Sequence, residues 1–153
     1  MTCISSIALR TKPSNPYQFW YWYGFNINQR KYLMKVRVYY DKKHKDYVDP
    51  YTMYFPYSKK IRDETKKSSG HLIMGTALSF NCHPDGSMTF FSWFDDDRDL
   101  GYNIPNCGDK KIKIETLPKG VQDYVAKMEK IWSDANKYDD KKHWDAWNNA
   151  AVC

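Results

Sequence analysis

The chain lacks long apolar runs and closely spaced cysteines. No stretch approaches the roughly 18 apolar residues of a membrane-spanning helix. The N-terminal residues, Met1–Arg10, lack the basic start and long apolar stretch of a secretion signal. We therefore expect no membrane association and a cytoplasmic location, which is host cytoplasm if the gene is carried by a phage. In that setting the four widely separated cysteines are predicted to be free thiols.

Acidic residues are absent from the first 40 positions. The first 70 residues hold 14 bases and 5 acids, whereas the remaining 83 hold 10 bases and 13 acids, within a net charge of +6. This asymmetry predicts an anionic macromolecular partner, either a host protein complex or a nucleic acid, for the basic half of the chain. Solubility and the protection of sheet edges by lysine explain the same charges equally well.

Familiar catalytic and cofactor motifs are also absent. The sequence contains no Gly-x-Gly-x-x-Gly, no Walker loop, no Gly-x-Ser-x-Gly and no His-Glu-x-x-His. Its four histidines stand in scattered contexts that do not suggest a general base with a partner. These absences favour a protein that is not an enzyme, and we expect no cofactor.

One stretch, Gln18–Asp41, is predicted to form an antiparallel hairpin with two different faces. With the loop at 28–31, Ile27 lies opposite Tyr32, and the apolar residues of both strands fall on one side. The other side combines aromatic rings with cations, which suits base stacking, phosphate contact or a protein interface. We predict that this face binds the partner through Trp20, Trp22, Lys35, Arg37 and Tyr39. If the C-terminal helices cover this face instead, the two tryptophans are core residues.

A second hairpin is predicted from residues 71–82 and 87–94. Its turn, His83–Gly86, has the Pro-Asp-Gly order that favours a tight reversal. Placing Cys82 opposite Ser87 puts a strip of small residues on one face, at Gly75, Ala77 and Ser79. Because a helix can approach small residues closely, we expect the C-terminal helices to lie on this strip.

Helices are predicted from about Leu117 onward, where apolar residues recur at steps of three and four. The first helix carries its apolar stripe from Val121 to Ala135, and the second runs roughly from Asp139 to Ala151. The predicted fold is α+β: an antiparallel sheet of about five to seven strands, including two main hairpins, with one or two C-terminal helices packed on one face. We expect a single domain over 1–153, β-rich over 1–116 and helical over 117–152.

The most polar segment, 58–70, is expected to be a mobile loop with at most one helical turn. Charge runs of this kind are usually solvated, but the bases also make it a candidate phosphate-binding loop. These bases are Lys59, Lys60, Arg62, Lys66 and Lys67.

Three aspartates, Asp95, Asp97 and Asp99, have the one-three-five spacing of a calcium-binding loop. The following glycine, Gly101, stands one place late for such a loop, and Arg98 within the run opposes a bound cation. We therefore predict no metal site here, and an exposed acidic turn instead.

Taken together, these patterns predict a small non-enzymatic binding protein. Lysine outnumbers arginine 19 to 5, a bias produced by AT-rich coding and common in phage and mobile-element genes. The favoured hypothesis is a phage or mobile-element factor that binds and modulates a host protein or nucleoprotein complex through the basic-aromatic face. One alternative is an enzyme that acts on an anionic substrate, a nucleotide or nucleic acid. Another is a structural protein that associates with itself.

Overall fold

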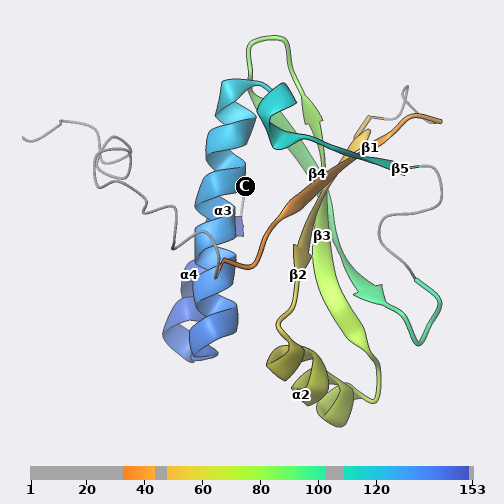
Figure 1. Ribbon diagram of the computed structural model, residues 1–153, viewed down its shortest axis with the longest axis vertical. Helices are drawn as coiled ribbons and strands as arrows, with labels where there is room; N and C mark the ends of the chain where they lie inside the picture. Colours follow the sequence, from red (N-terminus) through yellow and green to blue (C-terminus); the bar gives the residue numbers. More distant parts are fainter. Residues whose placement is uncertain (1–32, 44–47, 103–108, 152–153) are drawn as a thin grey trace, which may run out of the picture. The chain divides into compact units, whose positions relative to one another are not determined.

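The computed structural model describes residues 33–43, 48–102 and 109–151, which belong to one compact unit, Leu33–Cys153. Five antiparallel strands form one sheet in the order β4-β3-β2-β1-β5: β1 (Arg37–Asp41), β2 (Tyr51–Pro56), β3 (Ile73–Cys82), β4 (Met88–Asp97) and β5 (Asp109–Ile112). The helices are α2 (Lys59–Ser69), α3 (Lys119–Tyr138) and α4 (Lys141–Ala151), and a 3-10 turn, η2 (Ile114–Thr116), precedes α3. This arrangement confirms the predicted α+β class (Figure 1). No helix within these ranges combines the length and the apolar character needed to cross a bilayer.

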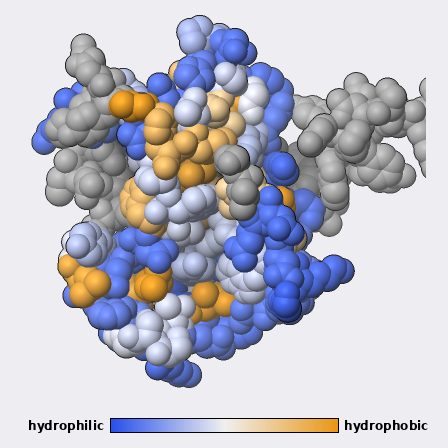
Figure 2. Space-filling model, turned by 180° about the vertical axis from the view of Figure 1, so that it is seen from behind, coloured by the Kyte–Doolittle hydropathy of each residue, from blue (hydrophilic) through white to orange (hydrophobic). Residues whose placement is uncertain are grey.

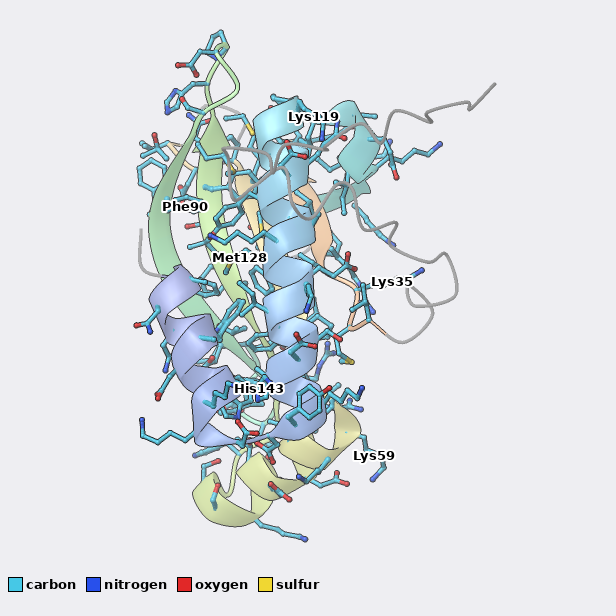
Figure 3. The ribbon with its side chains drawn as sticks, turned by 90° about the vertical axis from the view of Figure 1, so that its left-hand side faces the viewer. Lys35, Lys59, Phe90, Lys119, Met128 and His143 are labelled. Carbon is cyan, nitrogen blue, oxygen red and sulfur yellow. The ribbon has the colours of Figure 1, made fainter. Side chains whose placement is uncertain are left out.

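The core lies between one face of the sheet and the two C-terminal helices, which run side by side across it (Figure 3). The predicted apolar stripe of α3 is confirmed. Val121, Val125 and Met128 follow one another at steps of four and three residues, and all three are completely or almost completely buried. Trp147 is the buried residue of α4 in this core, and Trp144, Ala150 and Ala151 pack against it with part of their surface exposed. The buried residues of the core are Val36, Val38, Met53, Phe55, Leu78, Phe80, Leu117, Val121, Val125, Met128, Trp132, Ala135 and Trp147.

The predicted position of the helices on the sheet is wrong. They pack against the face that carries Leu78 and Phe80, whereas Ala77 belongs to a separate small cluster with Tyr39 and Tyr54. Large side chains bury more apolar area against a helix than glycine, alanine and serine do, which favours the observed face. The strip of small residues is occupied in another way, because the Tyr54 ring lies 2.8 Å from where a Cβ of Gly75 would stand.

The β3–β4 hairpin and its turn are confirmed, but the predicted register is wrong by one residue. Cys82 pairs with Met88 rather than with Ser87, and the register shifts again between Ser79 and Phe80. The register set at the turn places Phe90 opposite Phe80, on the face that carries the helices, and the β-bulge then adds one residue to β4, so that Trp93 lies opposite Leu78 on the same face. Gly86 closes the turn with a φ of 85°, which glycine adopts without strain.

The predicted hairpin over Gln18–Asp41 is contradicted at β1. Both edges of this strand are taken, since Val38 pairs with Met53 of β2 on one side and with Ile112 of β5 on the other. No free edge remains along Val38–Tyr40 for the predicted partner strand. The first half of that hairpin, 18–32, lies outside the residues that the structure describes.

The expected mobile loop at 58–70 is instead the helix α2. Ser58 caps its start by accepting a hydrogen bond from the backbone N–H of Ile61 at 3.3 Å, and Gly70 ends it with a left-handed φ of 79°. Ile61 is the buried residue of the helix. A single apolar anchor with two good caps gives a weak periodic signal, which explains why the sequence pattern did not reveal this helix.

Cys82 is a free thiol, as predicted. Burial raises its pKa, which keeps the thiol protonated and unreactive at neutral pH. The other three cysteines lie outside the described residues.

Candidate anion-binding surface

The predicted basic-aromatic face is divided by the structure into exposed cations and a buried ring. Lys35 and Arg37 are exposed and alternate with the core residues Val36 and Val38. Arg37, in β1, therefore lies on the side of the sheet that faces away from α3 and α4, and Lys35 stands just before this strand. Tyr39 shares this side, but only 9% of its surface is exposed because it packs with Tyr54 and Ala77. Tyr39 is thus not available to stack on a base, while Trp20 and Trp22 lie outside the described residues.

β5 brings further cations next to β1. In the antiparallel register Tyr39 lies opposite Lys111, so continuing the ladder by one step places Lys113 beside Arg37 on the same face. More bases gather where β1 ends and β5 begins. We name the exposed bases of these two strands and their ends the basic strip: Lys35, Arg37, Lys42, Lys43, Lys110, Lys111 and Lys113.

The basic strip is short of neutralising carboxylates. None of its seven bases forms an ion pair with any residue of the described ranges, and the segments 35–43 and 109–115 hold three acids. Asp41 accepts a hydrogen bond from the backbone N–H of Lys43 at 2.9 Å, which closes a local turn. Arg37 lies over the ring of Tyr54, with its guanidinium carbon 5.9 Å from the ring centroid. Like charges on neighbouring strands repel, so this surface gains stability when an anion binds.

Bases on the helices and at the far end of the sheet behave differently, because many of them have acidic partners. Lys130 and Asp134 of α3 pair at 2.8 Å, four residues apart on one helix. Arg98 reaches Asp96 at 3.1 Å. Within the part of the chain that the structure describes, the basic strip thus gathers seven exposed bases that no carboxylate pairs with.

The candidate phosphate-binding bases of α2 are mostly engaged. Lys59 pairs with Asp63, Lys60 pairs with Asp139 at 3.0 Å, and Lys66 pairs with Asp99. The hydrogen bond that Lys59 donates lowers the pKa of Asp63, and the hydrogen bond that Lys60 donates to Asp139 raises the pKa of Lys60. Arg62 donates to the sulfur of Met74 at 3.4 Å, and Lys67 is exposed in the last turn. Carboxylates thus hold three of these five bases.

The three aspartates with calcium-like spacing do not converge. Asp97 accepts hydrogen bonds from the backbone N–H groups of Asp99 and Leu100, at 3.1 and 3.2 Å, and so caps the turn that ends β4. Asp99 accepts from the N–H of Leu72 at 3.1 Å, whereas Asp95 is exposed. Among the described residues, no group of three histidines, cysteines or acids is arranged to hold a metal ion.

The sequence pattern revealed Lys35 and Arg37 but not the lysines of β5. Residues 110–115 alternate as a strand with one wet face, and that signal does not tell which strand they join. Pairing between β1 and β5 joins positions 68 to 74 residues apart, so only the fold places the two sets of bases together.

Comparison of the chain with protein-family models, with curated proteins and with solved structures gives no match.

Proposed function

We propose that this chain is a non-enzymatic binding protein that holds the phosphate backbone of a nucleic acid, free or within a nucleoprotein complex, on the basic strip. The observation that supports this proposal is the set of seven exposed bases on β1, β5 and their ends, without acidic partners in the described ranges. Neighbouring strands lie about 4.8 Å apart and alternate residues of one strand about 6.6 Å apart, so Arg37, Lys111 and Lys113 present a grid of charges on one face to an extended polyanion. Binding replaces the repulsion within this grid by attraction to phosphates.

The burial of Tyr39 defines the kind of recognition that we propose. Stacking on exposed rings contributes roughly 1–3 kcal/mol per base, and Tyr39 offers no such surface. Lysine and arginine contacts to phosphates carry no sequence information by themselves. The proposed binding is therefore electrostatic, independent of base sequence and sensitive to salt.

A salt series on a charge-reversed variant tests the proposal. Fluorescence anisotropy of labelled single-stranded and double-stranded DNA of equal length measures the affinity at several concentrations of salt. We expect the logarithm of the binding constant to fall linearly with the logarithm of salt concentration, and Lys111→Glu with Lys113→Glu to reduce both affinity and slope.

Lys141→Glu with Lys142→Glu is the matched control, because it makes the same change of net charge on α4. An equal loss of DNA affinity in the control means that net charge, not the basic strip, attracts the DNA. A flat salt response, or no binding at low salt, removes nucleic acid as the partner. An acidic protein surface is then the anion to test.

A further inference from the structure

β4 is the outermost strand on one side of the sheet, and no other strand of the described ranges pairs along its outer edge. Proteins usually protect such edges with short strands or charges, because unpaired backbone N–H and C=O groups recruit further strands. β5 at the opposite edge follows this rule, since it has four residues that include Lys110 and Lys111. β4 does not: it has ten residues, and 88–94 contains four aromatic residues and no charge.

A groove of about 600 Å³ lies between this edge and α4. Five of its ten lining residues are aromatic, and Trp93 meets Trp147 edge to face with ring centroids 5.4 Å apart. Phe91 and Trp93 keep 44% and 37% of their surface exposed, which is high for such large apolar side chains. Asn148 of α4 adds an exposed amide to the lining. Figure 2 shows this side of the molecule, where patches of apolar side chains stand between polar ones.

Negative charge lies at one end of this edge. β4 ends in three consecutive aspartates and contains no base. Asp95 is the exposed one of the three, whereas Asp96 and Asp97 are buried. Burial and, after it, the charge of Asp95 raise the pKa of Tyr57, a residue of the groove, to about 12. Asp95 also lies opposite Thr76, which lines the groove, so its charge favours a cation next to an apolar side chain there.

We propose that the edge of β4 and its groove dock an extended segment of a partner protein by strand addition. The segment places one large apolar side chain between Phe91 and Trp147, and a lysine or arginine beside Asp95. Main-chain hydrogen bonds to β4 supply affinity, and the groove and the acid supply selectivity. A second copy of β4 brings another acidic end and no base, so charge complementarity favours a basic segment over pairing between two copies.

This surface is separate from the basic strip, because β4 and β5 form opposite edges of the sheet. Lys35 and Phe90 lie on opposite sides of α3 in Figure 3. Binding at the β4 edge thus leaves the basic strip accessible, and the inference does not rest on the proposed function.

Designed peptides test the inference on the full chain. The first probe is a fluorescein-labelled peptide of alternating valine and threonine, with a central tryptophan and a lysine at the next position of the same face. The second probe replaces the lysine by glutamate, and the third replaces alternate threonines by proline, which cannot pair as a strand. We expect the lysine probe to bind, the glutamate probe to bind about tenfold more weakly, and the proline probe not to bind.

Two phenylalanines of β4 provide a matched pair of variants. Phe91 lines the groove, whereas Phe94 is similarly exposed, at 39%, and pairs with Ala77 on the helix-free face. Phe91→Ala is expected to reduce the affinity for the lysine probe about tenfold, and Phe94→Ala to leave this affinity unchanged. Equal effects of the two substitutions, or equal binding of the three probes, overturn the proposal. So does a dimer in analytical ultracentrifugation that Phe91→Ala dissociates, because it assigns the edge to a second copy.

Discussion

The hydroxyl of Tyr54 donates a hydrogen bond of 3.1 Å to Oδ2 of Asp96, a carboxylate without any exposed surface. The guanidinium of Arg98 donates to the same oxygen, also at 3.1 Å, whereas Oδ1 has no hydrogen-bond partner among the residues that the structure describes. Because a buried carboxylate without hydrogen bonds is costly, the stability of the fold depends strongly on the two donors to Oδ2. This contact joins β2 to β4 across β3 on the face without helices.

Removing the Tyr54 hydroxyl is expected to change stability in a pH-dependent way. Burial, followed by the charge of Asp96, raises the pKa of Tyr54 to about 12 from 10.0. Because the folded state holds this proton more tightly, the stabilisation is complete below pH 10 and declines as the pH rises toward 12. Tyr54→Phe should lower the free energy of unfolding by about 2 kcal/mol at neutral pH. The stability of this variant should also fall less steeply between pH 10 and 12. Urea unfolding at several pH values measures both effects; an unchanged decline assigns the alkaline loss to other groups, Tyr57 among them.

Asn136 of α3 is expected to be a strong link between that helix and the start of α2. Its Oδ1 accepts from the backbone N–H of Ser58 at 2.7 Å, and its Nδ2 donates to the carbonyl of Trp132 at 2.9 Å. Asn136→Ala leaves the Ser58 donor without its partner, so we expect a loss of about 1–3 kcal/mol in the free energy of unfolding. Asn149→Ala, at an exposed position of α4, is the control and should change little. Similar losses for both variants contradict the assigned role.

The parts of the fold that the sequence predicted correctly depend on local patterns. The stripe of α3 and the turn at His83–Gly86 each follow from neighbouring residues. The failures involve partners that are distant in the sequence. A bulge shifts the β3–β4 register, β1 pairs with the distant β5 as well as with β2, and Tyr54 buries Tyr39 from the next strand. Among the predicted binding residues, the cations Lys35 and Arg37 are exposed as the sequence predicted, because long charged side chains remain solvated in most environments.

Gly75 is expected to tolerate no side chain. A Cβ at this position would lie 2.5 Å from the carbonyl oxygen of Phe55 and 2.8 Å from the Tyr54 ring. The oxygen belongs to the backbone of a central strand, so it cannot move away without breaking the β2–β3 ladder. Gly75→Ala should therefore destabilise the fold by about 1–3 kcal/mol in thermal or urea unfolding. Gly101→Ala offers a comparison with open space around the new methyl group and a left-handed φ of 81°. If Gly75→Ala proves the milder of the two, close packing at Gly75 is not the constraint.

Lys113 should contribute to nucleic-acid binding through charge only. It follows β5, is exposed, and continues the register that places it beside Arg37. Because one phosphate contact accounts for a slope of about −0.9 in the salt dependence of duplex binding, Lys113→Ala should make the slope less steep by about one contact. The loss of affinity should be the same for DNA of different sequences. Lys59→Ala is the matched control, since that lysine is already paired with Asp63 on α2. Anisotropy titrations with two unrelated duplexes measure both quantities; a sequence-dependent loss, or an equal change in slope for the control, contradicts a backbone contact at Lys113.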